Sequence, residues 1–170
     1  GAPAADGAAG ARRGGAAGED LEDGGTGEDG VDHASTAQLL SSAAEYMRRN
    51  DYASALQIYS YVRKCNRSWE SPLVELKVLS NASLCLQRLR GRLPELVAAC
   101  NEVLDRIEDL REDGGGGVPE ETLLQMECAC LSRRGSAYSQ QRKPEESARD
   151  AARVRELLAR QGDAAAPPAP

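Results

Sequence analysis

The sequence has few of the large aromatic side chains that usually fill the core of a β-sheet protein. Its 170 residues include no Phe, one Trp and two Met, although hydrophobic residues make up 41% of the chain. Much of that fraction is Ala, so a core must be built from Leu, Val, Ile, Tyr and Ala. Aromatic and β-branched side chains favour strands, whereas this composition suits closely packed helices. The sequence therefore predicts an all-α protein.

Groups that carry out chemistry are also scarce. With only one histidine, the chain cannot assemble the usual set of nucleophile, base and orienting group. Cys128 and Cys130 are separated by a single residue, and neither a second cysteine pair nor a nearby His completes a tetrahedral metal site. The glycine-rich segments lack the Lys-Ser/Thr of a phosphate-binding loop. We therefore expect a protein that is not an enzyme, with no metal and no cofactor.

Charge and hydropathy exclude two classes of partner. No run approaches the roughly 20 apolar residues needed to cross a bilayer, so we expect no membrane partner. The formal net charge is −6, and clustered Lys and Arg are needed to neutralise phosphates, so we expect no nucleic acid. The five cysteines are odd in number and scattered, which does not suit a disulfide framework. They predict buried free thiols and a cytoplasmic location.

Composition divides the chain into a domain and two tails. Residues 1–34 are mostly Gly, Ala, Asp and Glu and bury too little apolar surface to offset the entropy of ordering, so an acidic disordered tail is expected there. Residues 162–170, rich in Ala and Pro, predict a second disordered tail. The domain between them, residues 35–161, contains a glycine-rich stretch at 113–118 that predicts a flexible loop.

Apolar residues at helical spacing predict six helices within this domain. Ser35 or Thr36 can cap the first, which should run to about Asn50. Proline fits the first turn of a helix, and four prolines open the third to sixth helices: Pro72, Pro94, Pro119 and Pro144. The second helix covers about 52–66 and the sixth ends near Arg160. Short links imply antiparallel neighbours, and hence three hairpins at about 36–67, 72–111 and 119–160.

The hairpins repeat one pattern of small and large residues. Ala43 and Ala55 in the first hairpin, and Gly135 in the third, fall where two helices must touch and a small residue is needed. Tyr46 and Tyr138 follow at one aromatic position, and the second hairpin fits this pattern more loosely. In this the chain resembles the tetratricopeptide repeat, which implies three hairpins stacked into a short right-handed superhelical solenoid. The alternative is an unrelated six-helix bundle.

Two segments narrow the resemblance to the co-chaperone arrays of this family. Residues 81–86 (Asn-Ala-Ser-Leu-Cys-Leu) and 133–138 (Arg-Arg-Gly-Ser-Ala-Tyr) are similar to those of axonemal dynein assembly factors, as is the insertion around 114–117. This resemblance implies a protein-binding adaptor in the cytoplasm, or in the cilium, that works with chaperones in dynein arm assembly. The alternative is a structural scaffold subunit of a ciliary or cytoskeletal complex, whose outer helices would make the contacts.

The co-chaperone resemblance also implies a peptide-binding site. Such arrays hold the acidic C-terminal tail of heat-shock chaperones with two Lys, two Asn and one Arg, because charge-assisted bonds suit its carboxylates. By position, Asn81 and Arg133 match the second Asn and the Arg. The first Lys, first Asn and second Lys are replaced by Leu40, Ala44 and Ala129.

Losing both lysines predicts a weakened clamp for the chaperone tail, since each lost bond costs on the order of 1.5–3 kcal/mol. Lys77, one turn before Asn81, can compensate in part, so the expected peptide-binding residues are Lys77, Asn81 and Arg133. Arg133 could instead be solvated or paired with a glutamate, and Asn81 could bond a backbone carbonyl. Tyr46 and Tyr138 are expected to pack rather than to stack on a ligand.

Overall fold

The computed structural model describes residues 32–66 and 68–164, and over these ranges every regular element is a helix. This confirms the predicted all-α class. The six helices are α1 His33–Arg48, α2 Tyr52–Cys65, α3 Pro72–Leu89, α4 Leu93–Glu112, α5 Glu120–Gln140 and α6 Pro144–Ala164. The tail expected at residues 1–34 lies outside the described residues up to position 31, and the tail at 162–170 does so from position 165.

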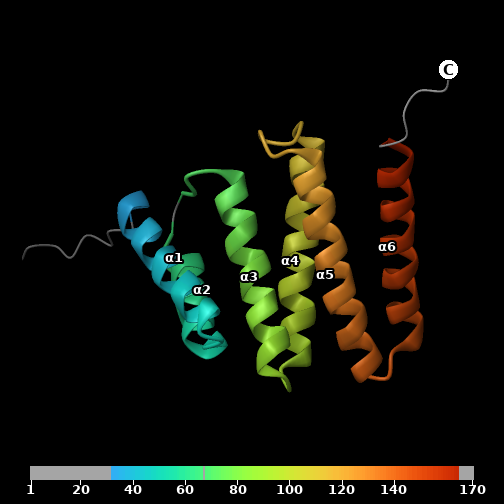
Figure 1. The fold of residues 1–170 in the computed structure, drawn as a ribbon, viewed down its shortest axis with the longest axis horizontal. Coiled ribbons are helices and arrows are strands. Elements are labelled where there is room, and N and C mark those ends of the chain that lie inside the picture. The colour runs from blue at the N-terminus through green and yellow to red at the C-terminus, as the bar shows by residue number, and fades with distance from the viewer. Residues whose placement is uncertain (1–31, 67, 165–170) are drawn as a thin grey trace, which may run out of the picture.

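The helices stand side by side in chain order, from α1 at one end of the array to α6 at the other (Figure 1). Each helix packs on the one before it and the one after it, and α3 also touches α5 directly. Because the links are short, successive helices run in opposite directions. Helices α1, α3 and α5 therefore run in the same direction.

The helix ends differ from the sequence prediction mainly at α1 and α6, and Pro119 precedes α5 as its cap and does not lie in its first turn. The side chain of Asp32, not Ser35 or Thr36, caps α1 by accepting a hydrogen bond of 2.6 Å from the Ser35 backbone N–H. Helix α6 continues to Ala164, beyond the predicted end at Arg160, because Ala, Arg and Gln favour helix. By contrast, α3 begins at Pro72 as predicted, with Ser71 as its cap.

The glycine-rich loop is built from left-handed backbone. All four residues of 114–117 have φ between 56° and 89°, a region that only glycine enters without strain. A side chain at Gly116 would meet Leu110 at 2.9 Å and Pro72 at 3.2 Å. The glycines therefore allow the link between α4 and α5 to turn tightly, in contact with the start of α3 and the last turn of α4.

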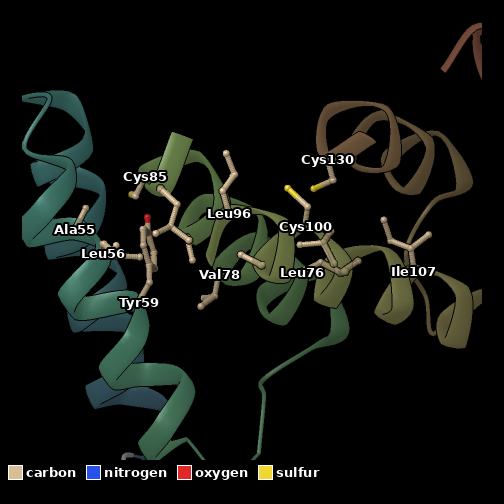
Figure 2. Close-up of a cluster of buried hydrophobic side chains, with 14 of the residues drawn as sticks. Ala55, Leu56, Tyr59, Leu76, Val78, Cys85, Leu96, Cys100, Ile107 and Cys130 are labelled. Atoms are coloured by element: carbon tan, nitrogen blue, oxygen red, sulfur yellow. The ribbon is translucent and has the colours of Figure 1, made fainter. Parts of the chain in front are cut away.

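The residues expected at close helix crossings are buried. Ala43 and Ala55 are 0% exposed, and Gly135 is also buried. A Cβ on Gly135 would lie 3.3 Å from the Cβ of Asp150 in α6, so α5 and α6 are in near contact there. Around the first two residues a continuous core links α1 to α5, and Figure 2 shows part of it, from Ala55 and Tyr59 to Ile107.

Helix α6 is attached differently from the rest. None of its described side chains belongs to the continuous core; instead Leu157, 2% exposed, is buried locally. Arg134 of α5 donates two hydrogen bonds, of 2.9 and 2.7 Å, to the carboxylate of Asp150 in α6. The close approach at Gly135 and a second ion pair, between Arg153 of α6 and Glu127 of α5, also join the two helices.

Two adjacent leucines of α6 give a matched test of this packing. Leu157→Ala should lower the free energy of unfolding by about 3 kcal/mol, because a buried leucine is replaced by a cavity. Leu158 is 53% exposed, so Leu158→Ala should change the stability by less than about 0.5 kcal/mol. Urea unfolding followed by circular dichroism measures both values. Equal effects of the two substitutions would contradict the packing of α6 described above.

Candidate peptide-binding site

Arg133 joins the two central helices of the candidate site. It projects from α5 toward α3, where its Nη1 donates to Ser83 Oγ at 3.1 Å, Ser80 Oγ at 3.3 Å and the Ser80 carbonyl at 3.4 Å. These acceptors are all neutral, and Arg133 forms no ion pair with a carboxylate among the described residues. The alternative of a pairing with a glutamate is therefore not seen there, and the guanidinium is held in place by two hydroxyl groups and a backbone carbonyl.

Asn81 and Lys77 lie on α3 near the same point. Asn81 Nδ2 donates to the Tyr59 hydroxyl at 3.2 Å, not to a backbone carbonyl as the sequence suggested. Lys77 is exposed and lies three residues before Ser80, so the two side chains share a face of the helix. Lys77 and Arg133 therefore flank Ser80, one from α3 and the other from α5.

The buried Tyr59 accepts the hydrogen bond that orients Asn81. The ring is 2% exposed, and burial raises the pKa of its hydroxyl, while the bond from Asn81 partly opposes that shift. The hydroxyl consequently stays neutral and serves as an acceptor for the amide. This bond fixes the orientation of Asn81 and leaves its carbonyl oxygen free of a described partner.

Beneath Arg133 lie two buried thiols. Figure 2 shows the side chains of Cys100 and Cys130 pointing toward one another, and Arg133 Nη1 is 3.8 Å from Cys130 Sγ. A hydrogen bond from Cys100 and the nearby Arg133 charge lower the pKa of Cys130 to about 7, against the effect of burial. The same hydrogen bond, together with burial, raises the pKa of Cys100. Cys130 is therefore the more acidic thiol of the pair.

The expectation of five buried thiols is only partly correct. Cys85, Cys100 and Cys130 are buried, whereas Cys65 and Cys128 are half-buried. Burial raises the pKa of Cys85 to about 11, which keeps this thiol protonated at neutral pH. All five are free.

The residues that replace the rest of the clamp supply no charge. Leu40 and Ala129 are half-buried on α1 and α5, and Ala44 is exposed on α1. The positions of the clamp thus divide into the predicted site residues on α3 and α5 (Lys77, Asn81 and Arg133), an uncharged stretch on α1, and the uncharged Ala129 on α5. Among the positions of the clamp, the positive charges of Lys77 and Arg133 therefore lie around Ser80.

The two tyrosines expected to pack are less enclosed than predicted. Tyr46 is 36% exposed, because it lies in the last turn of α1, where the chain turns at Asn50. Tyr138 is half-buried between two cations: Arg134 lies 5.9 Å and Lys143 5.8 Å from its ring centre. Both cations can interact favourably with the ring face, so Tyr138 links the end of α5 to the start of α6.

The polar network behind the site was not predicted from the sequence. Besides its two hydrogen bonds to Asp150, Arg134 donates a third from Nη1 to Asn101 Oδ1 of α4 at 2.7 Å. The hydrogen-bonded carboxylate of Asp150 raises the pKa of Arg134. The adjacent pair Arg133-Arg134 was the available signal, since two neighbouring residues on a helix point to different faces. Arg133 faces α3, whereas Arg134 forms hydrogen bonds to residues of both α4 and α6.

A hollow of about 870 Å³ opens between the start of α5 and the end of α6. Leu124 and Leu157 provide apolar surface in it, and three arginines line it. Each arginine is paired with glutamate: Arg111 with Glu120 and Glu127, Arg153 with Glu127 and Glu156, and Arg160 with Glu156. Because these charges are matched, the hollow favours neither sign of ligand.

Among the helices that the structure describes, none combines the length and apolar character needed to cross a bilayer.

The comparisons with known proteins give no relative: no protein-family model, no curated protein and no solved structure matches this chain.

Proposed function

We propose that this chain is a non-catalytic adaptor that binds an acidic peptide or protein segment on the face formed by α3 and α5. In this proposal the six helices are three hairpins of the tetratricopeptide type, stacked as a short right-handed solenoid. The support is the antiparallel packing of successive helices, the direct contact of α3 with α5 and the buried small residues at the crossings. The biological setting we favour is chaperone-linked assembly of axonemal dyneins in the cytoplasm.

The observation that carries the proposal is the environment of Arg133. Its guanidinium is oriented by two serines of α3 and is not neutralised by a described carboxylate. A cation held in one orientation loses less entropy on binding than a free one. Lys77 adds a second charge one turn away, and the Asn81 carbonyl oxygen can accept a bond from a peptide N–H. Together these groups suit a ligand with a carboxylate next to a polar backbone.

The heat-shock chaperone tail is the ligand that the family resemblance suggests, bound more weakly than by a complete clamp. Leu40, Ala44 and Ala129 cannot replace charge-assisted bonds, so we expect an affinity well below that of an intact site. Other acidic segments with a free carboxylate would compete on similar terms. Specificity would then arise from contacts with the uncharged stretch on α1.

A scaffold function would require broad apolar surface on the outer helices. The described large hydrophobic residues that are exposed are Tyr46, Tyr61 and Leu158, one each on α1, α2 and α6. Single exposed residues of this kind are normal for a soluble protein. The surface therefore favours the adaptor over the scaffold subunit.

Reversing the charge of Arg133 tests the proposed function. Arg133→Glu should weaken the binding of a labelled peptide ending in Glu-Glu-Val-Asp by roughly 10- to 100-fold, because one charge-assisted bond is lost and repulsion is added. Arg155, exposed on α6, provides the matched control: Arg155→Glu should leave the affinity nearly unchanged. Fluorescence anisotropy at moderate salt measures all three proteins.

Because Arg133 also contacts α3, its variants must be checked for folding. Arg133→Gln retains a donor for the serines but removes the charge, so it should lose most of the affinity while keeping the thermal unfolding midpoint. Equal binding by wild type, Arg133→Glu and Arg133→Gln would show that the ligand binds elsewhere.

A further inference from the structure

The net negative charge of this chain arises from its first 32 residues. Eight of the 27 acidic residues and two of the 21 basic ones lie there, and this difference equals the full net charge of −6. Residues 33–170 contain 19 acidic and 19 basic residues and are neutral overall. The helical array is therefore not an acidic body, and the acidic character of the chain belongs to one segment.

Within that segment the charge is concentrated further. Residues 19–29 contain six carboxylates and no basic residue, arranged as Glu-Asp-Leu-Glu-Asp at 19–23 and Glu-Asp at 28–29. This is the chemistry that the α3–α5 face is suited to bind: closely spaced carboxylates, here around a single leucine. Lys77 and Arg133 are two cations on that face without a described carboxylate partner.

Several arginines elsewhere on the array are paired with carboxylates of the array itself. Arg106 bonds Glu75 at 2.7 Å, and Arg134 bonds Asp150. Arg63 and Glu102 pair across α2 and α4. Pairing of this kind within the array leaves little net attraction for an external anion, whereas the region around Ser80 keeps its positive charge.

The acidic segment joins the array beside α3. His33, the first residue of α1, has its Nε2 3.3 Å from Ser68 Oγ in the link that leads into α3. Along α3, a rise of about 1.5 Å per residue places Lys77 about 8 Å and Ser80 about 12 Å beyond Pro72. The nine residues from Asp23 to Asp32 can span up to about 30 Å, so residues 19–29 can reach both cations.

From these observations we propose that residues 19–29 dock in cis on the α3–α5 face, with their carboxylates on Lys77 and Arg133, and thereby compete with an external acidic ligand. This proposal rests on the proposed function for its consequence, but the contact itself can be measured without any ligand. A short tether gives an effective concentration in the millimolar range. Even a weak intrinsic affinity would therefore occupy the face in much of the population.

The chain contains only three lysines, Lys64, Lys77 and Lys143, which permits a direct test. A water-soluble carbodiimide joins a lysine amine to a carboxylate only where the two are in contact. In the dilute full chain, cross-links to residues 19–29 should form predominantly at Lys77, as identified by peptide mass spectrometry of the monomer. All three lysines are exposed, so differences in yield report proximity.

Lys64 is the sharper control, because it lies near the end of α2, just before the link that His33 contacts. The Lys77 cross-link should fall in Arg133→Glu and in about 1 M salt, where screening acts over about 3 Å. Equal yields at Lys64 and Lys77, or yields that do not change with salt, would overturn docking on this face. Neither result depends on whether an external ligand binds.

A second variant links docking to competition. Replacing the six carboxylates of 19–29 by their amides should tighten binding of the acidic probe peptide to the full chain by roughly tenfold, since the site is no longer occupied in cis. Unchanged probe affinity would refute the competition. Failure of both the wild-type and the neutralised chain to bind the probe, together with a persistent Lys77 cross-link, would refute the proposed function but not the docking.

Discussion

Gly135→Leu is expected to destabilise the domain by about 3 kcal/mol, near the upper end for overpacking of a closely packed interior. The Cβ alone would lie 3.3 Å from the Cβ of Asp150 and 3.6 Å from the Ser147 carbonyl. The rest of a leucine side chain would have to displace α6. Because α6 is the last helix of the array and packs mainly on α5, we expect the loss to appear as early unfolding of this helix, measured by hydrogen exchange and by urea unfolding.

Gly162 provides the matched control for this substitution. It lies in α6, the helix that Gly135 contacts, and no atom lies within 4 Å of the position that its Cβ would take. Gly162→Leu should therefore be neutral or stabilising, by up to about 0.5–1 kcal/mol, because leucine has the higher helix propensity. Gly135→Leu with the stability of wild type would show that α5 and α6 do not cross closely.

Arg134→Ala is expected to cost about 3 kcal/mol. The substitution leaves the Asp150 carboxylate, whose side chain is 7% exposed, without its two hydrogen bonds, and it also removes the donor to Asn101. Breaking a buried ion pair from one side costs about 3–5 kcal/mol, and the lower value applies because Arg134 retains 21% exposure. Thermal and urea unfolding provide the measurement.

The double variant Arg134→Met/Asp150→Ala separates the ion pair from simple packing. Since no charge is then buried alone, it should recover most of the lost stability. Arg160, paired with Glu156 at the surface and 65% exposed, is the control: Arg160→Ala should cost less than about 0.5 kcal/mol. A double variant less stable than Arg134→Ala would contradict the role given to this pair.

Local sequence patterns predicted the helices well because helix starts and ends depend on residues that are close together in the sequence. Pro72 and the preceding Ser71 mark the start of α3, and the left-handed Asn50 marks the turn after α1. The cap of α1 was assigned wrongly because Asp32, Ser35 and Thr36 are all good capping residues. Only the backbone geometry selects among them.

The candidate site was less predictable because its residues meet across helices. The family resemblance proposed Arg133 and Asn81, but it could not show that the first contacts Ser80 and Ser83 or that the second bonds Tyr59. These contacts depend on how α3 approaches its neighbours. The role of Arg134 was missed for the same reason, since Asn101 and Asp150 are distant in the sequence.

The most direct test of the adaptor proposal is a map of amide chemical shifts. The isotope-labelled full chain, with the carboxylates of 19–29 neutralised, is titrated with the acidic peptide while amide signals are followed. We predict that the shifts gather at Lys77, Ser80, Asn81 and Arg133 on α3 and α5. Shifts confined to α2, α4 or α6, or no shift at millimolar peptide, would contradict binding on this face.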